Sequence, residues 1–261
     1  MALEFSGPGV PLSALAFAEA AETLGVHAPE VWAVLTVETR GLGFLPDRRP
    51  LILFERHVFH RETGGRHDRT DPAVSDAEPG GYTEGPHEYD RLQQAVRLDR
   101  TAALRSASWG IGQVMGFNSA KAGYPTVGAM VADMTRSEDV QLKAMVGEIR
   151  SGNLDRFLRV HDWTSFARGY NGVNFARNQY DARLAAAHQR FAQGPLPDLA
   201  VRQGQAFLVY LGFRPGPVDG IMGRRTRAAI GDFQRGEGLP SSGEMDDATL
   251  DRLRARTTLP S

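Results

Sequence analysis

Two glutamates have the side chain that acid–base chemistry needs, and each lies at the edge of an apolar pattern. Glu38 follows Val31 and Leu35 at spacings of i, i+4 and i+7, so it shares the helix face that should be core. It also falls in the last turn of that helix, where the helix dipole disfavours a negative charge by roughly 0.3–1 kcal/mol. Burial and dipole both favour the neutral carboxyl that a general acid requires. Glu38 is therefore a candidate general acid, and the alternative is a solvated residue at the border of this face.

Glu55 is the natural second carboxylate. It follows Leu51 and Leu53 with a period of two, which places it on their strand face where the strand leaves the core. Glycoside hydrolysis commonly uses two carboxyl groups, one to protonate the leaving oxygen and one to activate water or stabilise the oxocarbenium ion. The alternative is a surface ion pair with Arg56 or Arg48.

Glu55, His57 and His60 also form an E-x-H-x-x-H pattern that loosely resembles a metal site. Zinc enzymes place ligands at such spacings, but the sequence has no HExxH motif and the third ligand is unspecified. Histidines in an arginine-rich loop are more often solvated than bound to metal. We therefore expect no metal and no cofactor.

Residues 107–118, ASWGIGQVMGFN, place three glycines beside polar and aromatic side chains, and residues 168–172 are RGYNG. Glycine lets the backbone approach a ligand closely, and Gln and Asn offer both donors and acceptors. An exposed aromatic ring would suit a polysaccharide groove. The same glycines also fit a tight helix crossing with Trp109 in the core, and Asn-Gly is a common turn. The candidate substrate-binding residues are Ser108, Trp109, Gln113, Asn118, Tyr170 and Asn171.

The elements that must position these residues are mostly helical. The segment PLILFERHVF, from residue 50, predicts a short buried strand that turns into a helix, and the aperiodic residues 63–87 predict a long loop. A first helix is predicted to begin with Pro11 at its N1 position. The fold class is therefore mainly α with a small β element. Further helices are predicted at 29–40, 88–105, 137–151, 153–168 and 174–193.

The sequence GPLPD at residues 194–198 has the composition of a short, fairly stiff linker. It divides the chain into a larger domain at residues 1–193 and a smaller one at residues 199–261. The smaller part is close to the lower limit of size for independent folding.

Composition excludes several classes of function. The 261 residues carry a net charge of −1, so no global field favours nucleic acid. No apolar run approaches the ~18 residues of a membrane span. The absence of cysteine excludes disulfides, thiolate zinc sites and cysteine nucleophiles. The first residues lack the basic start and apolar core of a signal peptide, which predicts synthesis in the cytoplasm and another route to any wall substrate.

The motifs VETRGLGF, SWGIGQVMG and GYNG occur in the order found in the lysozyme-like superfamily. More narrowly, VETRG followed by RPLILFERHVF resembles the N-acetylmuramidase family of bacteriophage endolysins, over roughly residues 10–193. The resemblance implies a lysozyme-like catalytic domain that cleaves peptidoglycan between N-acetylmuramic acid and N-acetylglucosamine. It implies that Glu38 matches the catalytic acid and Glu55 the second carboxylate, and that Gln113, Tyr170 and Asn171 line the sugar groove.

The segment after the linker resembles the three-helix peptidoglycan-binding module, through LGF, PVDGIMGRRT, the helix into DFQ, and GL before DDATL. Gly204 departs from this pattern, because it should interrupt the first helix and weaken the module. In this module Asp219 is expected to cap a turn. The residues assigned to the wall-binding module are Asp219, Gly220, Gly223, Thr226, Phe233 and Gln234.

Together these features predict a monomeric two-domain peptidoglycan hydrolase with no nucleic-acid or membrane partner, acting on the cell wall after release and encoded by a phage. Three alternatives stay open. A lytic transglycosylase would use a single glutamate and leave a 1,6-anhydro end, a zinc amidase or peptidase would cut the stem peptide, and a wall-binding protein with a decayed lysozyme domain would release no sugars.

Overall fold

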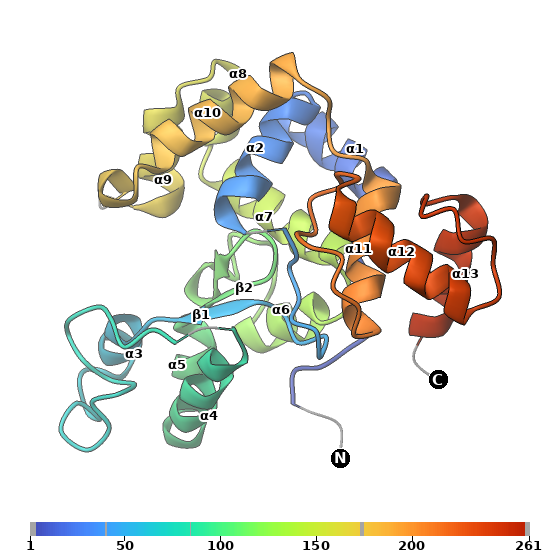
Figure 1. The fold of residues 1–261 in the computed structure, drawn as a ribbon. Coiled ribbons are helices and arrows are strands. Elements are labelled where there is room, and N and C mark those ends of the chain that lie inside the picture. The colour runs from blue at the N-terminus through green and yellow to red at the C-terminus, as the bar shows by residue number, and fades with distance from the viewer. Residues whose placement is uncertain (1–3, 40, 84, 173–174, 259–261) are drawn as a thin grey trace.

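The computed structural model describes residues 4–39, 41–83, 85–172 and 175–258, and it is mainly helical with one small sheet, as predicted (Figure 1). The sheet is antiparallel in the order β1 (Ile52–Phe54), β2 (Ala107–Trp109) and β3 (Val114–Met115), with Ile52 opposite Trp109 and Ser108 opposite Met115. The helices before residue 194 are α1 (Ala14–Leu24), α2 (Ala28–Glu38), α3 (Arg56–Thr63), α4 (Glu88–Leu98), α5 (Arg100–Arg105), α6 (Val127–Met134), α7 (Glu138–Ser151), α8 (Asp155–Arg159), α9 (Trp163–Asn171) and α10 (Tyr180–Gln193). Those after it are α11 (Leu199–Tyr210), α12 (Arg224–Gly236) and α13 (Asp247–Thr257).

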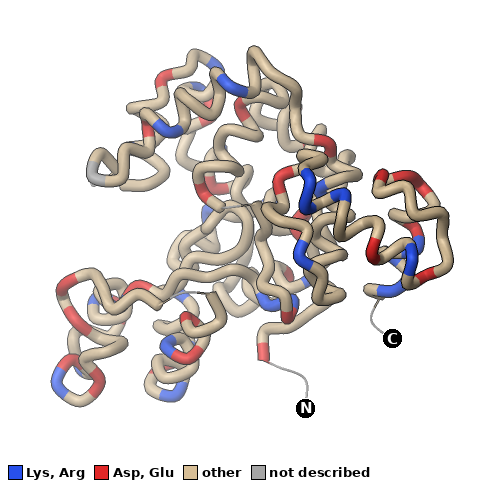
Figure 2. The backbone as a smooth tube through the Cα atoms, viewed as in Figure 1, with Lys and Arg blue, Asp and Glu red and all other residues tan. Residues whose placement is uncertain are grey.

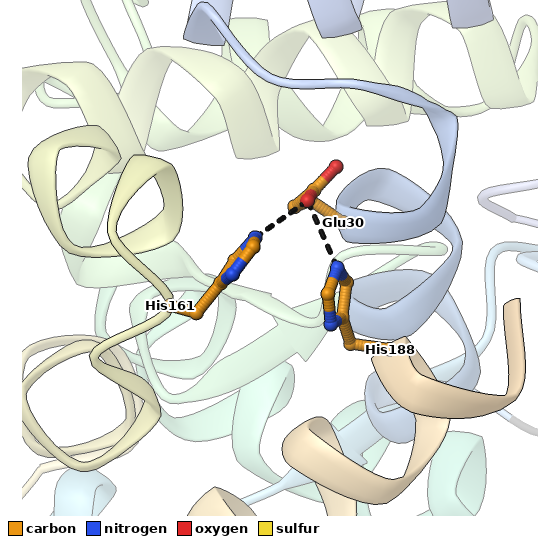
Figure 3. A group of neighbouring side chains, drawn as sticks. All are labelled: Glu30, His161 and His188. Atoms are coloured by element: carbon orange, nitrogen blue, oxygen red, sulfur yellow. Dashed lines mark hydrogen bonds and ion pairs between the residues drawn. The ribbon is translucent and has the colours of Figure 1, made fainter. Parts of the chain in front are cut away.

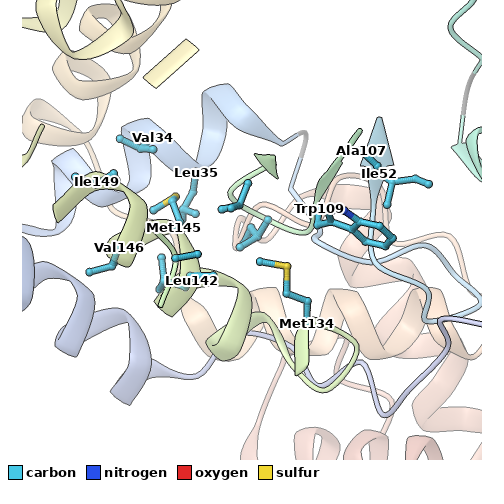
Figure 4. Packing of buried hydrophobic residues seen from close by; sticks show 14 of the residues in the cluster. Val34, Leu35, Ile52, Ala107, Trp109, Met134, Leu142, Met145, Val146 and Ile149 are labelled. Carbon is cyan, nitrogen blue, oxygen red and sulfur yellow. The ribbon is translucent and has the colours of Figure 1, made fainter. Parts of the chain in front are cut away.

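Helix α2 is the central element of this arrangement. Its start is fixed by Pro29 in the first turn and by a capping box in which Glu30 Oε2 accepts a hydrogen bond from the backbone of His27 at 3.0 Å. Residues 30–35 are all buried, and α10 lies along the helix in Figure 1. Val34 and Leu35 lie in the same core as Met145 of α7 (Figure 4). A helix buried on so many sides fixes the position of every residue at its ends.

Several element boundaries differ from the sequence prediction because a capping side chain intervenes. Helix α1 begins after Ser13, whose Oγ accepts from the backbone of Ala16, so Pro11 lies before the helix and not at its N1 position. The predicted helix 88–105 is two helices, because Asp99 caps α5 by accepting from Ala102. The predicted helix 153–168 divides in the same way at Asp162, which caps α9.

Gly204 does not interrupt the first helix after the linker, contrary to expectation. Helix α11 runs through it without a break, and a Cβ atom at this position would lie 2.0 Å from Cε of Met245. The glycine therefore allows close packing inside a small core that includes Phe207, Ile230 and Phe233. Alanine at this position would gain about 1 kcal/mol of helix propensity but would collide with Met245.

A buried ion pair joins α11 to the rest of the chain. Glu138, the first residue of α7, is fully buried, and its Oε2 accepts hydrogen bonds from the backbone of Leu12 at 2.8 Å and from Arg202 Nη1 at 2.6 Å. Its Oε1 accepts from the backbone of Gly43 at 2.7 Å and from Arg202 Nη2 at 2.8 Å. Arg202 also donates to the carbonyl of Gly41, just beyond α2. The ion pair thus connects the loop after α2 with the segment before α1 and with α11.

Further contacts extend this interface. Tyr210 donates its hydroxyl hydrogen to the carbonyl of Gly9 at 2.8 Å, and Arg48 Nη2 donates to the carbonyl of Thr257 at 2.5 Å. Residues 194–198 lead directly into α11, whose start is capped by Asp198. Helices α11 and α13 therefore contact the larger part of the molecule.

Acidic and basic residues are interspersed along the chain in Figure 2. Within the described residues, no helix combines the length and apolar character required to cross a bilayer.

Replacing Arg202 by Ala should lower the free energy of unfolding by about 3–5 kcal/mol, because the fully buried carboxylate of Glu138 would lose its counter-charge. The matched control is Arg254→Ala, which removes an exposed ion pair with Asp251 and should cost less than about 1 kcal/mol. Urea unfolding of both variants measures the difference. Equal losses would show that the buried pair contributes no more than a surface one.

Candidate active site

Glu38 is the last residue of α2 and is partly buried. Its Oε1 accepts a hydrogen bond from Asn171 Nδ2 at 3.0 Å, and Arg183 donates to the neighbouring carbonyl of Val37 at 3.0 Å. Burial raises the pKa of Glu38 to about 7, and this effect outweighs the opposing hydrogen bond from Asn171 and the charge of Arg183. The carboxyl group is therefore substantially protonated at neutral pH, as its position on the buried face at the end of the helix predicted.

Glu148 of α7 is a second carboxyl group of this kind, and the sequence analysis missed it. It is 8% exposed and accepts a hydrogen bond from Asn118 Nδ2 at 2.5 Å. Burial raises its pKa to about 7, while Asn118 and the charge of Lys121 oppose the shift. Its negative charge in turn raises the pKa of Glu38. The available signal was its position three residues after the buried Met145, the same kind of spacing that singled out Glu38.

Glu55 directly follows β1 and occupies the N-cap position of α3. Its Oε2 accepts a hydrogen bond from the hydroxyl of Tyr82 at 2.9 Å and lies 3.2 Å from His57 Nδ1. The alternative ion pairs do not form, because Arg56 contacts Asp76 and Arg48 donates to Pro8 and Thr257. Tyr82 belongs to the 63–87 loop, so this loop reaches the second carboxylate.

Tyr180, at the start of α10, is close enough to both candidate carboxylates for their charges to affect its pKa. Burial raises the pKa of its hydroxyl, and the negative charges of Glu38 and Glu55 raise it further. Both charges therefore act on the same side chain. Tyr180, Arg183 and Tyr82 carry no local motif, which explains why sequence analysis did not identify them.

The polar residues of the glycine-rich segment bond mainly to the protein. Ser108 donates to Gln113 Oε1 at 2.8 Å, and Gln113 Nε2 donates to the carbonyl of Gly110 at 2.8 Å. Gln113 has φ of 47°, a left-handed conformation that costs a non-glycine residue on the order of 1 kcal/mol or more. Tyr170 donates to the carbonyl of Gly112 at 2.7 Å. These hydrogen bonds fix the glycine-rich segment beside α9, the helix whose Asn171 contacts Glu38.

Trp109 is a correction to the predicted substrate-binding set. It is 0% exposed, and its Nε1 donates to the carbonyl of Leu104 at 3.1 Å, so its ring cannot stack on a sugar. The glycines of this segment serve packing in the same way. A Cβ at Gly112 would lie 2.6 Å from Met145, and one at Gly110 would lie 2.4 Å from Gln141. The structure thus favours the core-packing interpretation of these residues.

The histidines of the E-x-H-x-x-H pattern do not converge. His57 faces Glu55, whereas His60 Nδ1 lies 2.7 Å from Asp68 Oδ2. Within the described ranges, three potential metal-ligating side chains come together elsewhere, at Glu30, His161 and His188 (Figure 3).

Most of the residues assigned to wall binding have structural roles in the unit formed by the C-terminal helices. Asp219 Oδ1 accepts from the backbone of Ile221 at 3.0 Å, which caps the expected turn, and Gly220 has φ of 75°. Gln234 is 1% exposed and bonds to Thr249 and the backbone of Gly243.

The remaining three assigned residues also have structural roles. Thr226 and Phe233 are buried at 2% and 3% exposure, so neither can offer its side chain to a surface ligand. Gly223 is exposed with φ of −84° and is the N-cap residue of α12. These three residues thus contribute to the structure of the three-helix unit.

Comparison with known proteins relates both parts of the chain to cell-wall proteins. A family model for N-acetylmuramidase matches residues 27–192, and one for a putative peptidoglycan binding domain matches residues 198–253. The crystal structure of Burkholderia AP3 phage endolysin is similar with a TM-score of 0.64 and 38% sequence identity, covering 70% of this chain and 71% of that one. Localization factor PodJL of Caulobacter vibrioides is 45% identical over 49 residues, which is 19% of this chain and only 5% of PodJL.

The raised pKa of Glu38 predicts how stability depends on pH. A carboxyl group whose pKa rises from 4.5 to about 7 on folding destabilises the native state as pH increases through that interval. Glu38→Gln removes this penalty, so its free energy of unfolding relative to wild type should increase between pH 5 and pH 8, by at most about 3 kcal/mol.

Urea unfolding at both pH values tests this prediction. Glu22→Gln, at an exposed position on α1, is the control and should show a difference from wild type that does not change with pH. A Glu38→Gln difference that is equally flat would mean that Glu38 ionises like an exposed carboxyl group.

Proposed function

The chain belongs to the N-acetylmuramidase family and is a peptidoglycan hydrolase, and we propose that Glu38 is its general acid. The observation that carries this assignment is a carboxyl group held by burial at a pKa of about 7. Such a group is substantially protonated at neutral pH and can donate its proton to the glycosidic oxygen between N-acetylmuramic acid and N-acetylglucosamine.

Asn171 and Arg183 assist the proposed acid. Both lower the pKa of Glu38, which means that they stabilise the carboxylate formed when the proton leaves. Asn171 Oδ1 is buried and has no hydrogen-bond partner among the described residues. Asn171 as a residue is only partly buried, and an unsatisfied acceptor beside the acid is suited to a hydroxyl or amide hydrogen of the sugar.

Glu55 takes the second role. Its carboxylate either activates the attacking water or stabilises the oxocarbenium ion. The hydroxyl of Tyr82 fixes Oε2, so the group is oriented before substrate arrives. The negative charges of Glu55 and Glu38 both raise the pKa of Tyr180, which supports a common reaction site. Neither role requires a cofactor.

The polar groove residues have supporting roles in this scheme. Ser108, Gln113 and Tyr170 hold the glycine-rich segment against α9, and Asn118 holds Glu148. They keep the wall of the site rigid, and Asn171 makes the direct contact with sugar.

The C-terminal unit anchors the enzyme to its substrate. We assign residues 1–193 to the catalytic domain, 194–198 to the linker and 199–261 to the peptidoglycan-binding domain. Attachment to the insoluble wall raises the effective concentration of the catalytic site there. Because the ion pair of Arg202 and Glu138 joins the two domains, attachment through the C-terminal domain also fixes the orientation of the active site. The similarity to the AP3 phage endolysin supports a phage-encoded enzyme that reaches the wall after release, and we propose that it acts as a monomer.

Glu38→Gln should reduce the release of soluble fragments from purified peptidoglycan at least about 100-fold, since the amide cannot donate the required proton. The variant should still sediment with insoluble peptidoglycan, because the anchor is unchanged. Glu22→Gln, at an exposed position near the C-terminal end of α1, serves as the matched control and should keep full activity. Full activity in Glu38→Gln would refute the assignment.

A further inference from the structure

Glu30, His161 and His188 come together at the N-terminal end of α2, eight residues and therefore about 12 Å along the helix from Glu38 (Figure 3). Glu30 belongs to α2, His161 to the turn between α8 and α9, and His188 to α10. The two histidines are 131 and 158 residues from Glu30 in sequence. No local motif could reveal this group, and the muramidase chemistry does not use it.

Both imidazoles point at the same oxygen atom. His161 Nε2 lies 2.7 Å from Glu30 Oε1, and His188 Nε2 lies 2.9 Å from it. The potential ligand atoms of all three side chains lie within 4.8 Å of one another. Although burial raises the pKa of Glu30, hydrogen bonds from both histidines and the backbone of His27 hold it below its ordinary value. The group is therefore a carboxylate with two converging imidazole nitrogens.

The side chains are held in place by packing. Glu30 is 5% exposed, and its other oxygen is bonded to the backbone of His27. The ring of His161 stacks on Trp163 at a centroid distance of 5.4 Å and an interplanar angle of 10°. The ring of His188 lies 5.1 Å from Trp163 and 4.2 Å from His161. This packing pre-organises both imidazoles, which reduces the entropic cost of binding an ion.

From these observations we propose that Glu30, His161 and His188 form a binding site for a divalent transition-metal ion such as Zn²⁺. Two imidazole nitrogens and one carboxylate oxygen are a ligand set that zinc accepts, with a fourth position left for water. Imidazole ligands favour Zn²⁺, Cu²⁺ or Ni²⁺ over Mg²⁺ and Ca²⁺, which prefer oxygen. The side chain of His161 is 46% exposed, so the ion has a path from solvent.

The change needed for binding is small. Tetrahedral coordination with bonds of about 2.0–2.1 Å places neighbouring ligand atoms roughly 3.3 Å apart, so the two Nε2 atoms must each move less than about 1 Å from Oε1. The hydrogen on each Nε2 moves to Nδ1 of the same ring as the imidazole changes tautomer.

A bound ion would connect α2, the turn that leads into α9, and α10, and all three helices carry residues of the candidate active site. Helix α2 ends in Glu38, α9 ends in Asn171, and α10 carries Arg183. An ion shared among Glu30, His161 and His188 would thus stabilise the folded catalytic domain in proportion to its occupancy.

Titration of chelator-treated full-length protein with ZnCl₂ in a calorimeter tests the site directly. We expect one Zn²⁺ per chain, and binding at least tenfold weaker in His161→Ala and in His188→Ala. His60→Ala is the matched control, because His60 also faces a carboxylate, that of Asp68, but among the described residues this pair belongs to no group of three potential ligands. It should bind Zn²⁺ like wild type, and Mg²⁺ should not compete.

A second measurement covers the case in which His188→Ala fails to fold. Co²⁺ added to wild type should produce the visible absorption of a tetrahedral site, and His161→Ala, altered at an exposed side chain, should lose it. Zn²⁺ should also raise Tm of wild type more than that of His161→Ala. Absence of saturable binding in wild type, or equal binding in wild type and His161→Ala, would overturn the proposal and leave a hydrogen-bonded Glu–His–His group. The readout is binding, so the result is independent of the catalytic assignment.

Discussion

The burial of helix α2 is the constraint on which the rest of the structure depends. Its buried face packs against α10 and the α7 core, and both of its ends place a glutamate where water is largely excluded. At the C-terminal end this produces a carboxyl group with a pKa of about 7, and Asn171 and Arg183 are aligned on it because α9 and α10 pack beside the helix. At the N-terminal end it places Glu30 opposite two histidines from the same neighbouring elements.

The buried Glu138–Arg202 pair extends this constraint to the wall-binding domain. Glu138 accepts a hydrogen bond from the backbone of Gly43, and Arg202 donates one to the carbonyl of Gly41. The loop that follows α2 is therefore fixed by residues from both parts of the chain. Paired charges buried this deeply contribute less to net stability than to fixing one arrangement, because desolvation offsets much of their attraction. The consequence is that the part matched by the N-acetylmuramidase family and the part matched by the peptidoglycan-binding family share an interface, in place of a loose tether between them.

The mainly helical fold class and the raised pKa of Glu38 were predictable because local periodicity reveals helices and the face on which a residue lies. The capping aspartates Asp99 and Asp162 divided helices that periodicity alone joined, and Ser13 moved the start of α1. Trp109 was misassigned because a strand segment does not reveal which face is buried. Residues that meet only through tertiary packing escaped prediction. Tyr180 and Tyr82 reach the carboxylates from distant segments, and His161 and His188 meet Glu30 across more than 130 residues.

Mass spectrometry of purified peptidoglycan digested in ¹⁸O-labelled water tests the central claim most directly. Hydrolysis with Glu38 as acid predicts fragments that end in reducing N-acetylmuramic acid carrying one ¹⁸O atom, and their loss in Glu38→Gln. Fragments with 1,6-anhydro ends would show a lytic transglycosylase and leave Glu55 without its role. Intact glycan with cleaved stem peptides would contradict the account altogether.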